Sequence, residues 1–86
     1  MPEQTLKNNL AKLRRELDVA ESLVEDTRRE LADVADSIEH LLEAPEPDYA
    51  SARADLETSA LRFEARHPTF SRILSEVTDA LAKLGF

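Results

Sequence analysis

The chain has one pair of side chains whose types and spacing could do chemistry, in the segment LRFEARHPTF at residues 61–70. Glu64 and His67 are three residues apart, so a continuous helix would present the carboxylate and the imidazole on one face. Helical bundles that hold two metal ions use this E-x-x-H spacing. In a dimer the pair would occur twice, and acidic residues of the N-terminal half could complete the ligand set. Metal binding by Glu64 and His67 is therefore one hypothesis.

The next residue favours a structural role for the same segment. Pro68 has no backbone N–H and crowds the carbonyl four residues earlier, so a helix running through it must kink or restart. Proline at the first position of a new helix would be such a restart. His67 also continues the apolar stripe of Phe63 and Phe70, where a half-buried structural histidine is the ordinary outcome. We therefore favour a bend at Pro68 over a metal site.

No other catalytic pattern is present. Nucleophile motifs, a glycine-rich phosphate loop and a basic stripe with interleaved aromatic residues are all absent from the sequence. The carboxylates could act as acids or bases only in a pocket that shifts their pKa values, and nothing in the helical pattern implies one. We therefore expect a protein that is not an enzyme and that needs no cofactor.

Composition limits the fold class and the partners. The 86 residues include no cysteine and one glycine, with 34% charged and 42% hydrophobic residues, which favours a single helical domain over residues 1–86. The acidic net charge of −7 argues against nucleic acid or an anionic membrane as a partner. No stretch approaches the ~20 apolar residues of a membrane span, and the polar start lacks a secretory signal. We expect a cytoplasmic protein.

A heptad pattern runs through the N-terminal half and predicts a helical arm over about residues 4–43. Its apolar positions, spaced alternately by four and three, are Leu6, Leu10, Leu13, Leu17, Ala20, Val24, Thr27, Leu31, Val34, Ile38 and Leu41. The pattern is weakest at Ala20 and Thr27, and between them Ser22 and Glu25 form a capping-box pattern that would start a new helix. The arm is therefore either one continuous helix or two helices broken near residues 18–23.

Two prolines separate this arm from a second one. Pro45 and Pro47 end the first helix within the turn at residues 44–48, and Asp48 is a good N-cap for the next helix. The second arm covers about residues 48–84, and we expect a kink at Pro68. Gly85 comes directly after the last apolar residue of the stripe and would close the helix at its C-terminal end.

The predicted fold is all-α: an antiparallel helical hairpin with coiled-coil-like heptads. The apolar stripe is too wide for two arms packed only on each other. The first arm can fold back as a third helix, two hairpins can associate, or both can hold at once, and we expect a dimeric bundle. The stripe assigned to self-association consists of Leu31, Val34, Ile38, Leu41, Phe63, Phe70, Ile73, Leu74, Val77 and Leu81.

The function predicted from this pattern is a non-enzymatic interaction or scaffold module that acts through helix-to-helix contacts. Its expected partner is a second copy, as a homodimer or small homo-oligomer, or another helical protein.

Several segments resemble a known family. RFEARHPTF followed by ILSEVTDALAKLGF is similar to the C-terminal signature of a small bacterial family, the domain-of-unknown-function family four-four-zero-four. LKNNLAKLRREL and the later RREL and IEHLLE also resemble it, so the resemblance covers nearly the whole chain. The positions that match the family pattern are Phe63, Glu64, His67, Pro68, Ala80, Leu81 and Gly85.

The resemblance implies a short helical fold and a bacterial source. It transfers no catalytic or ligand residue, because the family has no assigned activity. Relatives tend to carry proline or serine between the first two helices, where this chain reads DVAESLVED. The analogy favours a turn near residues 18–23, while the residues themselves still permit one continuous helix.

Overall fold

The chain folds into four α-helices in the computed structural model, which describes residues 2–21 and 23–84, with the backbone alone for Pro2. The helices are α1 (Pro2–Val19), α2 (Glu25–Glu43), α3 (Tyr49–Phe63) and α4 (Pro68–Leu84). Within these described ranges there is no strand, so the prediction of an all-α fold is confirmed. No helix in this part of the chain is both long and apolar enough to cross a membrane.

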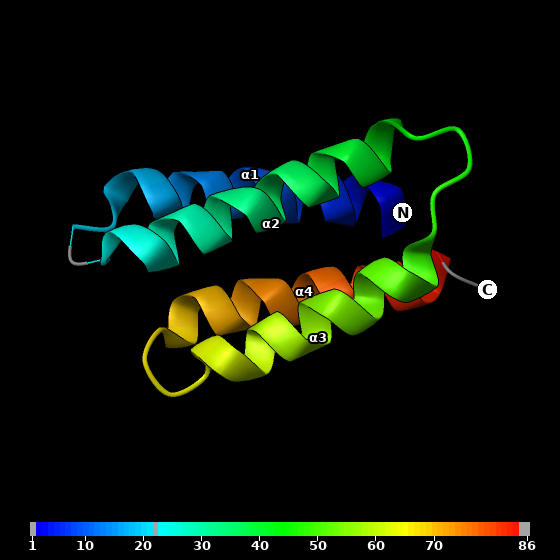
Figure 1. Cartoon of the computed structure of the whole chain (residues 1–86). Helices are drawn as coiled ribbons and strands as arrows, with labels where there is room; N and C mark the ends of the chain where they lie inside the picture. The colour runs from blue at the N-terminus through cyan, green and yellow to red at the C-terminus, as the bar shows by residue number, and fades with distance from the viewer. Residues whose placement is uncertain (1, 22, 85–86) are drawn as a thin grey trace.

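The helices form two hairpins arranged as two layers (Figure 1). α1 and α2 make the upper layer, and α3 and α4 make the lower one. Close packing joins α1 to α2, α1 to α4, and α3 to α4. α4 therefore lies against two other helices, while α2 has only α1 as a closely packed neighbour in the described structure.

This arrangement corrects the prediction of a hairpin with two long arms. The first arm breaks between Val19, where α1 ends, and Glu25, where α2 begins, close to the predicted break near 18–23, so it is not one continuous helix. The second arm is not one helix with a kink. The chain reverses direction between Phe63, where α3 ends, and Pro68, where α4 begins (Figure 1). Each predicted arm is itself a hairpin, because folding back lets the chain cover its own wide apolar stripe.

Apolar residues from all four helices make the core. The buried ones are Leu6, Leu13, Leu17, Leu31, Ala35, Ile38, Leu56, Ala60, Phe63, Phe70, Ile73, Leu74, Val77, Ala80 and Leu81. Eight of the ten residues assigned to self-association belong to this core, so the single chain already covers them. The other two, Val34 and Leu41, are half-buried on α2.

Side chains satisfy backbone groups at two helix ends. Asp48 is the N-cap residue of α3, as predicted, and its Oδ1 accepts a hydrogen bond from the backbone N–H of Ser51 at 3.1 Å. Arg28 of α2 donates to backbone carbonyls at the end of α1. The predicted caps at Ser22 and Gly85 lie outside the described residues, and the N-cap residue of α2 is Val24, which makes no side-chain cap hydrogen bond.

Candidate functional site

The turn between α3 and α4 contains the E-x-x-H pair. Glu64 is the C-cap residue of α3, and its backbone N–H donates to the carbonyl of Leu61 at 3.3 Å. The N–H of His67 donates to the carbonyl of Phe63 at 2.8 Å, while Pro68 is the first residue of α4. Proline is well suited there, because the N–H groups of a first helical turn have no intrahelical acceptor. The segment is therefore a helix restart.

The ring of His67 packs between two aromatic rings. Its centroid lies 6.1 Å from that of Phe63 and 6.2 Å from that of Phe70, both in edge-to-face geometry. His67 is half-buried, whereas Glu64 is exposed. This environment agrees with the structural role favoured for His67 on sequence grounds.

Metal binding by Glu64 and His67 has no structural support. Zinc sites in proteins have three or four protein ligands around the metal. The described residues contain no group of three or more His, Cys, Asp or Glu side chains that could hold a metal ion.

A cavity adjoins this turn and the start of α2. Its lining comprises Val24, Thr27, Glu30, Arg62, Phe63, Arg66 and His67. Arg62 of α3 forms an ion pair with Glu30 of α2. The pair links the two helices at this end of the molecule and neutralises both charges.

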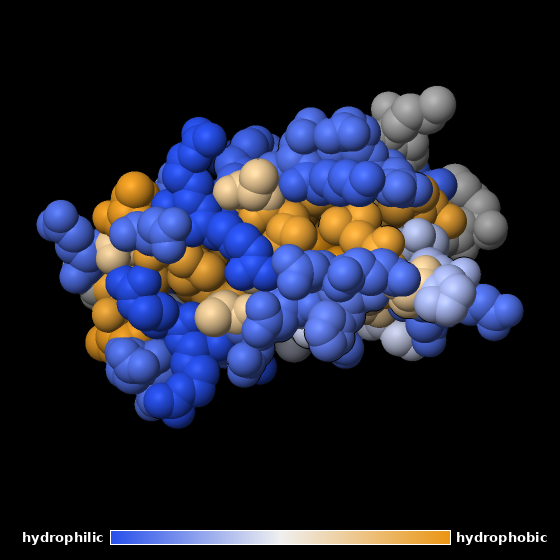
Figure 2. Space-filling view, turned by 90° about the horizontal axis from the view of Figure 1, so that it is seen from above, coloured by the Kyte–Doolittle hydropathy of each residue, from blue (hydrophilic) through white to orange (hydrophobic). Residues whose placement is uncertain are grey.

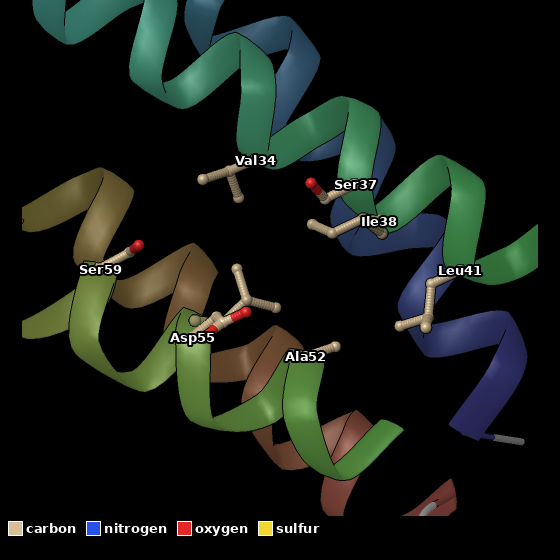
Figure 3. A pocket seen from close by; sticks show the side chains of 8 residues that line it. Val34, Ser37, Ile38, Leu41, Ala52, Asp55 and Ser59 are labelled. Carbon is tan, nitrogen blue, oxygen red and sulfur yellow. The ribbon is translucent and has the colours of Figure 1, made fainter. Parts of the chain in front are cut away.

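An apolar groove lies farther along the same two helices (Figure 3). Its cavity has a volume of about 150 Å³. The lining residues are Val34, Ser37, Ile38 and Leu41 of α2 and Ala52, Asp55, Leu56 and Ser59 of α3. We call this cavity the α2–α3 groove. It is open to solvent because α2 and α3 are not a closely packed pair.

The groove has an apolar floor and polar edges. Ile38 and Leu56 are buried at its base, and Val34 is half-buried above them. Ser37 and Asp55 are exposed, one on each helix. Figure 3 shows Val34 and Ile38 of α2 and Asp55 of α3 projecting into the space between the two helices. The arrangement can accept an apolar group and contact polar groups beside it.

A second apolar surface lies over α1 and α2. Figure 2 shows hydrophobic residues there between two bands of hydrophilic residues. Leu10 of α1 and Leu42 of α2 are among the half-buried residues packed against the core. α2 thus combines three buried residues with the half-buried Val34, Leu41 and Leu42. It is less completely covered than α4, which has seven buried residues.

Sequence reasoning missed the polar residues of the groove. Val34, Ile38 and Leu41 were assigned to the apolar stripe, but Ser37, Asp55 and Ser59 were not singled out. Their spacing carried a signal, since both sets of lining residues fall at positions i, i+3, i+4 and i+7 of a helix. Which two stripes would face each other depended on the chain reversals, and these could not be placed from spacing alone.

Comparison with known proteins gives one family match. Residues 6–86 match the model of the family described as Domain of unknown function (DUF4404), which confirms the resemblance seen in the sequence. Neither curated proteins nor solved structures give a match.

Proposed function

Because the chain belongs to the DUF4404 family, whose description assigns no activity, we propose a function from the surface of the molecule. The protein is a non-enzymatic interaction module that binds one helix of another protein in the α2–α3 groove. The observation that supports this proposal is the solvent-open apolar floor between two helices that do not pack closely together. Helix-in-groove recognition uses such a surface, with anchors from the bound helix at positions i, i+3, i+4 and i+7.

The size of the groove indicates how a helix would bind. A cavity of about 150 Å³ holds a group about as large as benzene. It therefore fits one large apolar side chain, such as leucine or phenylalanine, while the body of the helix lies along the polar edges. Burial of one such side chain contributes about 1.5–3 kcal/mol, so we expect weak, reversible binding.

A titration with a synthetic helical peptide tests this function. The probe is a peptide with a leucine stripe at i, i+3, i+4 and i+7 and glutamine elsewhere, added to the isotope-labelled full chain. We expect the largest NMR shift changes at residues 34–41 and 52–59. Shift changes confined to other surfaces, or no binding, would contradict the proposal.

A pair of matched variants makes the test specific. Ser59→Trp places a large ring at the half-buried edge of the groove and should abolish peptide binding. Ser75→Trp makes the same change at an exposed position of α4 and should leave binding unchanged. Equal loss of binding in both variants would mean that the groove is not the binding surface.

The alternative occupant of the groove is a helix from a second copy of the chain, which would make the protein self-associate. Light scattering across a concentration series measures it directly. A dimer that Ser59→Trp converts to a monomer would place a second copy in the groove and would contradict binding of another protein there. A monomer at all concentrations would leave another helical protein as the proposed partner.

A further inference from the structure

We infer that the helix bound in the α2–α3 groove is basic, with lysine or arginine beside its apolar anchor where it passes Asp33 and Asp55. This inference rests on the proposed function and specifies the chemistry of the partner. It follows from the charges at the edges of the groove.

Each helix carries an aspartate at the groove or beside it. Asp55 of α3 lines the groove and is exposed. Asp33 of α2 is also exposed and precedes the lining residue Ser37 by four positions, so both lie on the same face of α2. Neither aspartate forms an ion pair within the described part of the chain.

The cations of the two helices are all engaged elsewhere. α2 and α3 contain four arginines and no lysine. Arg29 pairs with Glu25, Arg53 with Glu57 and Arg62 with Glu30. Arg28 is directed to the backbone carbonyls at the end of α1. No arginine of α2 or α3 is left to neutralise the two aspartates.

The negative charge of α2 adds to the attraction for a cation at the groove. The helix carries seven carboxylates and two arginines. Arg14 of α1 approaches two of these carboxylates, Asp36 at 3.4 Å and Glu39 at 3.2 Å, whereas Asp33 has no such partner among the described residues. A cation on an incoming helix can therefore pair with Asp33 without displacing an existing ion pair.

The same charges disfavour a second copy in the groove. Each copy has a net charge of −7 and would bring its own acidic residues toward the acidic edge. Like charges brought together across an interface oppose association, and complementary charges steer a partner to its site. A basic amphipathic helix of another protein is thus the favoured occupant.

The expected effect is moderate because both aspartates are exposed. Exposed ion pairs contribute about 0.2–1 kcal/mol each, so two of them change Kd by about 2- to 30-fold. The difference should shrink at high salt, because salt screens exposed charges.

Three synthetic peptides test the inference by fluorescence anisotropy with the full chain. They share one leucine stripe and carry lysine, glutamine or glutamate at the flanking positions. We expect the lysine peptide to bind about 2- to 30-fold more tightly than the glutamine peptide, and the glutamate peptide to bind most weakly. Circular dichroism checks that each protein variant used remains folded.

Two double variants with equal net charge distinguish two causes of lysine preference. One is attraction by the two aspartates at the groove, and the other is attraction by the net charge of the whole protein. Asp33→Asn with Asp55→Asn should remove most of the preference for lysine. Asp18→Asn with Asp79→Asn neutralises two exposed aspartates on α1 and α4 and should retain it. Equal loss of preference in both would overturn the inference, because the attraction would then depend on net charge alone.

The result also separates this inference from the proposed function. Equal binding of all three peptides, abolished by Ser59→Trp, would overturn the basic partner and support the groove as a helix-binding site. Absence of binding by every peptide would overturn both.

Discussion

The guanidinium of Arg28 on α2 donates a hydrogen bond of 2.6 Å to the backbone carbonyl of Leu17 in the last turn of α1. A second bond of 2.7 Å reaches the carbonyl of Ala20. The last carbonyls of a helix have no intrahelical donor and carry its negative dipole end. α1 has no basic residue in its own last turn, so α2 supplies the cation that closes it.

Arg28→Ala should lower the free energy of unfolding by about 1.5–3 kcal/mol, the range for hydrogen bonds to charged groups. Urea unfolding followed by circular dichroism measures the change. The matched control is Arg29→Ala, because Arg29 is exposed and its one ion pair among the described residues is with Glu25, at 3.8 Å. Its expected cost is about 0.3–0.5 kcal/mol. Equal costs for the two variants would contradict a capping role for Arg28.

Asn9→Leu should raise the free energy of unfolding by about 1–3 kcal/mol. Asn9 is 3% exposed on α1, and its Nδ2 has no hydrogen-bond partner in the described structure. Leucine has a similar size and removes the cost of a buried unpaired donor. Thermal and urea unfolding give the measurement, with Asn8→Leu at the neighbouring exposed position as the control. Loss of stability in Asn9→Leu would mean that the amide has a partner in solution.

Asp48→Ala should destabilise the chain near neutral pH and have little effect in acid. The backbone N–H of Ser51 donates to the Asp48 carboxylate and holds its pKa below the usual value. A lowered folded-state pKa contributes stability above the ordinary pKa of aspartate, and this stability is lost as the pH falls through the folded-state pKa. Melting temperatures of the two proteins across a pH series test this. A pH-independent effect of Asp48→Ala would exclude the charged cap.

Pro68→Ala should lower the free energy of unfolding by only about 0.4–1 kcal/mol, through greater freedom of the unfolded chain. Pro68 begins α4 and interrupts no helix, since α3 ends at Phe63. If it instead kinked one continuous helix, its removal would stabilise the chain by about 3 kcal/mol. Urea unfolding distinguishes a small loss from a gain.

Apolar spacing in the sequence predicted much of the core. Leu6, Leu13, Leu31 and Ile38 were placed on the stripe, and each is almost fully buried. The turn at residues 44–48 and the cap at Asp48 were also predicted, because proline and an N-cap residue act through local backbone sterics and hydrogen bonding. These features depend on near neighbours in sequence.

The helices against which the apolar stripe packs could not be predicted in the same way. Leu31 and Ile38 were assigned to self-association, and their replacement by aspartate would disrupt assembly if these residues met a second copy. In the structure both are buried within one chain, so the change is expected to unfold it. Heptad spacing does not reveal whether the partner helix belongs to the same molecule. The contact of Arg28 with α1 likewise depends on a chain reversal between them.

Because α2 has fewer closely packed neighbours than α4, we expect α2 to open locally more readily than α4. Among the described helices α2 packs closely on α1 alone, whereas α4 packs on both α1 and α3. Backbone amides of α2 should therefore exchange with deuterium faster than those of α4, because fewer buried contacts must be lost to expose them. A partner in the groove would slow exchange along α2 first, so protection of this helix reports occupancy even when the ligand is unknown.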